Sequence, residues 1–269
     1  MHGTSLASAR AVLAEAEPVL AAAGKDAETI GEQLLDIVSI LDGSGPLRRA
    51  LTDPARAGAD KAGLVKQLFA KSDERTVNIM ERLAAERWSK ENDLADAVEF
   101  IGVEAMLIAA ENASEMQTVA DQLFQFDREV HRHRDLRIAL ADHDLPASQR
   151  TAVIEKLIGN AHPIARELAK RAVAHPRGRS LTASLLLVGD LAAARRDRRV
   201  ATVTSATPLS EPQHDRIKGL LKQIYGVEVQ LNVAVEPEVL GGIRIRIGDE
   251  IFDATVLTRL SEARRSFAS

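Results

Sequence analysis

The residues of this sequence that could do chemistry are few and scattered. Gly241-Gly242 could form a phosphate-binding loop, His131 and His133 could hold a metal ion, and the run Arg195-Arg196-Asp197-Arg198-Arg199 could contact an acidic partner. The chain has no cysteine, which excludes disulfides and thiolate metal sites. The sequence around each candidate decides between a chemical and a structural role.

The surrounding sequence favours structural roles for all three. A phosphate loop opens onto a helix N-terminus, whereas Gly241-Gly242 opens onto the alternating, strand-like segment 243–247, which predicts a tight turn. His131 and His133 stand at i and i+2, so a helix would point them in different directions, and no nearby His or Cys completes a tetrahedral site. The arginine run ends a predicted helix, where cations complement the helix dipole, with an acidic protein partner as the alternative. We therefore expect no catalytic site, no metal ion and no cofactor.

The composition limits the classes of partner. The net charge is −4, from 35 basic and 39 acidic residues, and aromatic residues make up 3%, which is poor material for binding nucleic acid. No apolar run approaches the roughly 18 to 20 residues needed to span a bilayer. The segment 1–10 lacks a basic head followed by an apolar block, so no signal peptide is expected. These features predict an intracellular protein.

Helical periodicity dominates the first two thirds of the chain. Ile30, Leu34, Ile37 and Leu41 fall on one helix face, and the breaker-rich segment 42–46 ends that helix. Further helices are predicted over 148–158, 163–173 and 180–196. These stripes predict a helical bundle.

An internal repeat lies within this helical region. The segment 47–53, Leu-Arg-Arg-Ala-Leu-Thr-Asp, reappears at 136–142 as Leu-Arg-Ile-Ala-Leu-Ala-Asp, an offset of 136 − 47 = 89. The same offset relates Gln33-Leu34 to Gln122-Leu123 and Arg82 to Arg171 without gaps. Unrelated amphipathic helices would not keep one register through the intervening loops, so we predict two related helical modules.

The period changes from helical to alternating near residue 200. Strands are predicted over 200–205, 227–235 and 243–247, with a short one around 251–252. A helix with a Ser210/Gln213 capping box separates the first two strands, and a last helix is predicted over 256–267. We expect the first of these helices to bury Ile217, Leu220, Leu221 and Ile224.

Together these patterns predict an α+β protein of three parts. Residues 1–111, the first module, are expected to form an N-terminal helical bundle. Residues 112–196, the second module, are expected to repeat it. Residues 197–269 are expected to form a small C-terminal α/β domain.

The C-terminal part resembles the delta subunit of F-type ATP synthases, the family that includes the mitochondrial oligomycin-sensitivity-conferring protein. The resemblance rests on the segments 203–210, 236–249 and 251–260, and its signature turn includes Pro237, Gly241, Gly242 and Asp253. The family usually has Asp-Gly-Ser where this chain has Asp253-Ala254-Thr255. In the helical part the match is softer, and the second module resembles a long, duplicated bacterial form of the subunit.

The resemblance implies a non-catalytic subunit of the peripheral stalk (stator). The N-terminal bundle would hold helical segments of the alpha subunits of the catalytic head, and the C-terminal domain would meet the b-type stalk subunits. Such a chain would lie at the cytoplasmic face of the cell membrane, reaching the membrane only through its partners. The candidate residues for receiving the alpha segments are Leu6, Leu13, Ile30, Leu34 and Ile37. The alternative is that each of them is simply a core residue.

One alternative comes from another functional class. The duplicated module and the arginine clusters would also suit a helical-repeat scaffold or an RNA-binding adaptor. The acidic net charge and the C-terminal signature argue against it. An electrophoretic mobility shift at moderate salt distinguishes the two, because a stalk subunit should bind no RNA.

Overall fold

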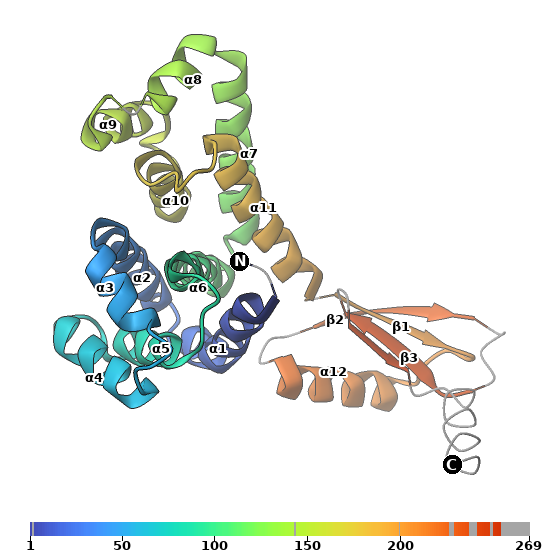
Figure 1. The fold of residues 1–269 in the computed structure, drawn as a ribbon. Helices are drawn as coiled ribbons and strands as arrows, with labels where there is room; N and C mark the ends of the chain where they lie inside the picture. The colour runs from blue at the N-terminus through green and yellow to red at the C-terminus, as the bar shows by residue number, and fades with distance from the viewer. Residues whose placement is uncertain are drawn as a thin grey trace. The chain divides into compact units, whose positions relative to one another are not determined.

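The chain folds into two compact units, Met1–Gly189 and Asp190–Ser269. Figure 1 shows the computed structural model, which describes all residues except 2, 143, 199, 226–228, 237–240, 248–249 and 254–269, and leaves the side chains of 197, 198 and 200 undescribed. The units divide within helix α11 (Leu181–Arg198), before the boundary predicted at residue 196.

The first six helices of the helical unit form a bundle with the last of them, α6, at its centre. They are α1 (Gly3–Ala22), α2 (Asp26–Gly43), α3 (Gly45–Thr52), α4 (Gly58–Leu68), α5 (Glu74–Ala85) and α6 (Glu91–Asn112). Helix α6 contacts α1, α2, α3 and α5, and every residue from 101 to 111 is buried. A helix that is apolar nearly all round must be covered on every side, which explains its central place.

Two glycines let α2 and α6 approach closely. A Cβ atom on Gly31 would lie 2.6 Å from Met106 Cγ and 2.9 Å from the Gly102 carbonyl oxygen. A Cβ atom on Gly102 would lie 3.1 Å from the side chain of Leu35. Both helices therefore need glycine where they cross.

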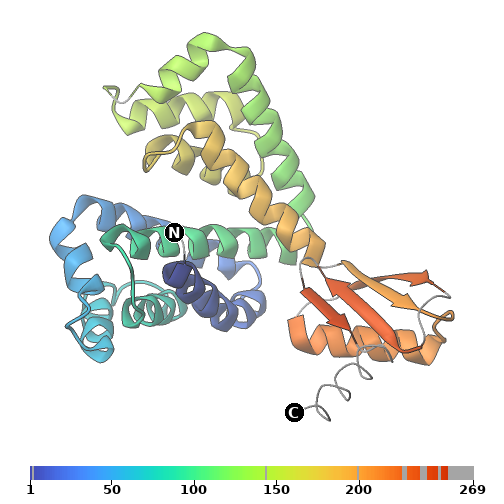
Figure 2. The ribbon, with the colours of Figure 1, turned by 45° about the vertical axis from the view of Figure 1, so that its right-hand side comes forward.

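The next helices repeat the first set. They are α7 (Met116–Arg132), α8 (Arg134–Ala141), α9 (Ala147–Ile158), α10 (Pro163–Ala174) and α11. Shifted by 89 positions, α3 and α5 coincide with α8 and α10, while α2 and α4 differ from α7 and α9 by one residue at one end. Figure 2 shows the second set of helices. The predicted duplication is confirmed.

Equivalent hydrogen bonds support the same conclusion at the level of side chains. In the first module Gln33 Oε1 accepts from the Asp73 backbone N–H at 2.9 Å, and in the second Gln122 Oε1 accepts from the His162 backbone N–H at 2.7 Å. Each bond fixes the start of the helix that follows, α5 or α10. A matching turn recurs after α3 and α8, where an aspartate Oδ1 accepts from the backbone N–H two residues on, at Asp53/Ala55 and Asp142/Asp144.

The second unit contains a four-stranded mixed sheet. Its strands are β1 (Val200–Ser205), β2 (Gln230–Val235), β3 (Ile243–Ile247) and β4 (Glu250–Asp253), in the order β2-β1-β3-β4. Strand β1 is parallel to β2 and antiparallel to β3, which is antiparallel to β4. Helix α12 (Glu211–Tyr225) connects β1 to β2 and packs on one face of the sheet. The core it shares with the sheet consists of Ala201, Val203, Ile217, Leu221, Val229 and Ile247.

Helix α12 buries fewer residues than the sequence predicted. Ile217 and Leu221 are buried, but Leu220 is 49% exposed and Ile224 63% exposed, so the prediction for these two is wrong. A single helix on one sheet face buries a narrow stripe, and these two side chains lie beside it. The Gln213 Oε1 accepts from the Ser210 backbone N–H at 2.9 Å, as expected at the helix start. The helix predicted over 256–267 lies outside the described residues.

Candidate partner-binding surfaces

The five residues predicted to receive a partner helix come from α1 and α2. Four are core residues, with exposed fractions of 4% for Leu13, 0% for Ile30 and Leu34, and 2% for Ile37, while Leu6 is partly exposed. The structure thus gives these four the packing role that the sequence left open. A partner helix would contact them only if the bundle opened, and their role in binding stays a prediction.

A charged junction joins the two modules, and the sequence analysis did not find it. The guanidinium of Arg177 lies 2.7 Å from Asp42 Oδ1 and 2.6 Å from Asp96 Oδ1, and its Nε atom lies 3.5 Å from Glu99 Oε2. Two further arginines of the second module, Arg171 and Arg179, pair with Asp36 and Glu99 of the first. We call these side chains of Arg171, Arg177 and Arg179 with Asp36, Asp42, Asp96 and Glu99 the junction cluster.

The junction also contains a histidine. His175 Nε2 lies 3.3 Å from Ser39 Oγ, and Arg171 donates to Ser39 Oγ at 3.0 Å and to the Leu35 carbonyl oxygen at 2.9 Å. Burial, followed by the positive charge of Arg171, lowers the pKa of His175. The neutral imidazole is therefore the form that fits this junction.

The net charges of the two modules, read from the sequence, could have predicted that ion pairs join them. Residues 1–111 contain 19 acidic and 12 basic residues, whereas residues 112–196 contain 10 acidic and 13 basic residues. Opposite excess charge on neighbouring modules favours ion pairs between them. The pairing partners themselves could not be predicted, because they are far apart in the sequence.

The signature turn leads into strand β3 through a backbone conformation that glycine adopts readily. Gly241 and Gly242 have φ values of 104° and 84°, a region that side chains disfavour, so glycine is required at both positions. The pair precedes a strand and not a helix, so it lacks the context of a phosphate loop. Asp253 ends β4, and its Oδ2 accepts from Arg244 Nε at 3.2 Å across the β3–β4 pair. Pro237 lies outside the described residues.

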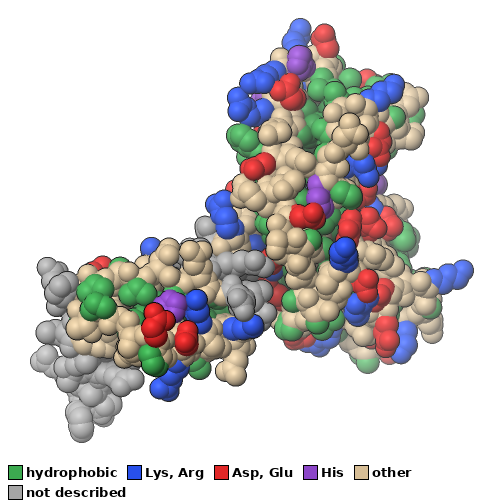
Figure 3. Space-filling view, turned by 180° about the vertical axis from the view of Figure 1, so that it is seen from behind, with side chains coloured by type: hydrophobic (Ala, Val, Ile, Leu, Met, Phe, Trp, Pro, Cys, Tyr) green, Lys and Arg blue, Asp and Glu red, His purple; other side chains and the backbone are tan. Residues whose placement is uncertain are grey.

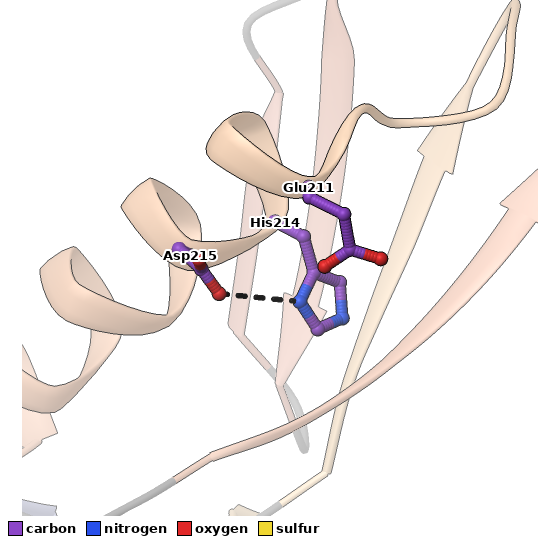
Figure 4. A group of neighbouring side chains, drawn as sticks. All are labelled: Glu211, His214 and Asp215. Carbon is purple, nitrogen blue, oxygen red and sulfur yellow. Dashed lines mark ion pairs between the residues drawn. The ribbon is translucent and has the colours of Figure 1, made fainter.

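Three potential metal ligands meet at the start of α12. Figure 4 shows Glu211, His214 and Asp215, with His214 Nδ1 4.0 Å from Asp215 Oδ1. All three lie in the first turns of one helix, where the positive end of the helix dipole opposes a cation. The two histidines singled out in the sequence, His131 and His133, are exposed. We assign no metal site to either group.

The arginine run lies at the C-terminus of α11, as its helix-capping interpretation requires. Helix α11 ends at Arg198, Arg195 is buried and Arg196 is exposed. Arg199 lies outside the described residues. On the face shown in Figure 3, acidic and basic side chains are interspersed and form no field of a single sign. Such a surface does not favour the RNA-binding alternative.

The fold defines a class of two-part proteins in which a duplicated helical module is followed by a small mixed α/β domain. Among the described residues, no helix has both the length and the apolar character required to cross a membrane. The family model "ATP synthase delta (OSCP) subunit" matches residues 103–267. The chain belongs to this ATP synthase subunit family.

Full-length relatives agree with this assignment. A protein of Beutenbergia cavernae called ATP synthase subunit delta is 44% identical over 270 residues, covering 100% of both chains. A protein of the same name from Streptomyces griseus is 42% identical and covers 90% of each chain. A chain of the Toxoplasma gondii mitochondrial ATP synthase hexamer matches 62% of this chain and 95% of its own length, at 17% identity and a TM-score of 0.32, too low to support an argument.

Proposed function

We propose that this chain is a peripheral-stalk (stator) subunit of a proton-translocating F-type ATP synthase. It ties the catalytic head to the b-type stalk subunits, so that the head does not turn with the rotor and rotation drives ATP synthesis. The observation that carries the proposal is the 44% identity, over the full length of both chains, to a protein called ATP synthase subunit delta. The chain itself needs no catalytic site and no cofactor for this role.

The two units suit two separate contacts. The N-terminal helices bind the alpha subunits of the head, because a helical bundle can receive an amphipathic partner helix along a groove between its own helices. The C-terminal domain binds the b-type subunits, and the exposed Leu220 and Ile224 of α12 give it an apolar surface for this contact. Leu6, Leu13, Ile30, Leu34 and Ile37 support the first contact by shaping the bundle.

The junction cluster supports a mechanical role for the helical unit. Ion pairs between the modules resist their separation when force is applied along the chain. The chain reaches the cytoplasmic face of the cell membrane through its protein partners, and no part of the proposal requires contact with lipid or nucleic acid.

A bridging assay tests the proposal. The soluble part of the b-type subunits is immobilised, and isolated catalytic head is added with or without the full chain. The head should be retained only when the full chain is present. The matched control is an equimolar mixture of fragments 1–198 and 199–269, which keeps α11 intact. Each fragment should bind its own partner, but the mixture should not bridge them. Retention of the head without the chain would refute the proposal.

A further inference from the structure

A basic pocket lies in the first module, outside the surfaces described above. Its volume is about 500 Å³, and it lies between the start of α4 and the α5–α6 connection. The lining residues are Thr52, Pro54, Ala55, Arg56, Ala57, Gly58, Lys61, Ala85, Arg87 and Trp88. All charged residues among them are cations, so the pocket is suited to an anion.

Lys61 brings a buried charge to this pocket. The residue is only 3% exposed, and its Nζ donates to the Glu86 carbonyl oxygen at 3.2 Å. An ammonium group has three N–H donors, so this bond leaves capacity for a ligand. Burial, and to a smaller extent the nearby Arg87, lower the pKa of Lys61, while Asp53 and Glu86 oppose the shift. Cations brought together in this way repel one another, and a bound anion would relieve the repulsion.

The start of α4 adds uncapped backbone donors. The N-cap residue Ala57 makes no side-chain cap hydrogen bond, and the first turn of this 11-residue helix carries one carboxylate, that of Asp60. Helix N-termini favour anions through these N–H groups and the helix dipole. A Cβ atom on Gly58 would lie 3.3 Å from Ala85, so glycine permits the close approach of the two segments.

The second module shows which of these features are structural. Lys61 corresponds to Arg150, which is also buried and donates to the Val173 carbonyl oxygen at 2.7 Å, near the end of α10. A buried cation near the C-terminus of α5, or of its counterpart α10, is thus common to both copies and belongs to the fold. Arg56 and Arg87, however, correspond to Leu145 and Pro176. The arginines that make the pocket strongly basic occur in the first module alone.

We propose that this pocket binds a phosphate group, either as inorganic phosphate or as the phosphate of a nucleotide. Arg56 and Arg87 pair with the phosphate oxygens, Lys61 supplies a buried charge, and the start of α4 supplies backbone N–H groups. The volume exceeds that of one phosphate and falls in the range of small-molecule sites, about 300–1,000 Å³. Trp88 offers an indole face beside the cations. The proposal goes beyond the stalk function and does not depend on it.

Trp88 is the single tryptophan of the chain and lines the pocket, so its fluorescence reports directly on binding. The full chain is titrated with sodium phosphate and with ADP at low ionic strength, with sodium chloride as the ionic control, and the heat of binding is measured in parallel by calorimetry. We expect saturable binding of phosphate or ADP, and none of chloride. Tighter binding of ADP than of phosphate would assign a nucleotide as the ligand, and equal binding would assign free phosphate.

Two exposed positions provide the variants. Arg87→Gln and Arg56→Leu, the latter taking the residue of the second module, should each weaken binding at least about tenfold, because each removes a charge-assisted contact. The matched control Arg49→Gln removes an exposed arginine that does not line the pocket and should bind like the wild type. Circular dichroism checks that each variant is folded. Absence of saturable binding by both methods, or equal weakening in the control, would overturn the proposal.

Discussion

Replacing Arg177 with glutamine should destabilise the helical unit by separating its modules. The Arg177 side chain is 9% exposed and lies between Asp42 and Asp96, at 2.7 and 2.6 Å, with Glu99 at 3.5 Å from its Nε atom. Without the guanidinium, Asp42 loses its ion-pair partner, whereas Glu99 keeps its pair with Arg179 and Asp96 lies 3.7 Å from the N-terminal ammonium of Met1. Glutamine can keep some hydrogen bonding but cannot neutralise the charge.

The expected cost follows from the burial of the cluster. Removing one partner of a fully buried ion pair costs about 3–5 kcal/mol, whereas exposed pairs contribute about 0–1 kcal/mol. Arg177 is nearly buried, but Asp42 and Asp96 are 33% and 32% exposed, so water screens part of the interaction. We expect a loss of about 2 kcal/mol in the free energy of unfolding, between these limits.

Urea unfolding followed by circular dichroism measures this loss. The matched control is Arg132→Gln, whose pair with Glu129 has exposed fractions of 58% and 51% and should contribute no more than about 0.5 kcal/mol. Adding Asp42→Asn and Asp96→Asn to the Arg177 variant should recover part of the stability, because the repelling charges are gone. An Arg177 variant as stable as the Arg132 variant would refute the role of the junction cluster.

Three further predictions use the same unfolding measurement. Gly31→Ala should lower the free energy of unfolding by about 2 kcal/mol, because the new Cβ atom would meet the backbone of α6. Gly63 lies in the middle of α4 with open space around it, so Gly63→Ala should raise the free energy of unfolding by about 0.5–1 kcal/mol. Equal effects of the two substitutions would contradict the close packing of α2 on α6. Gln33→Ala should lower the free energy of unfolding more than Gln122→Ala, since Gln33 also accepts a hydrogen bond from a threonine hydroxyl. A larger loss for Gln122→Ala would contradict the roles assigned to these two equivalent glutamines. Because the pKa of His175 is lowered in the folded chain, the unfolded chain protonates this histidine more readily, and stability should fall as the pH drops below about 6.5. His175→Gln should reduce this fall in stability. An unchanged pH profile in the variant would contradict the prediction.

Local patterns in the sequence predicted most of the fold. Apolar spacing predicted α2, α9, α10 and α11, and the offset of 89 residues related the two modules, because buried side chains such as Leu34 and Leu123 recur in one register. Strict alternation predicted β1 and β3, since the two faces of a strand differ in burial. These features depend on neighbours along the chain, which is why one sequence was enough.

Features that depend on distant segments were not predictable in this way. Leu220 and Ile224 have helical spacing relative to Ile217 and Leu221, but spacing does not indicate how wide a stripe the sheet covers. The junction cluster depends on how the second module docks on the first. The sequence also could not distinguish core residues from partner-binding residues, as Leu13 and Ile30 show. An apolar stripe that faces the core and one that binds a partner helix have the same helical spacing.

The role of this chain as a connector is best tested by measuring proton-driven ATP synthesis by the synthase, assembled in vesicles with and without the chain. Enzyme lacking the chain should lose coupled synthesis, although its catalytic head still hydrolyses ATP, and adding the full chain should restore synthesis. Fully coupled synthesis in the absence of the chain would contradict its role as the connection between head and stalk.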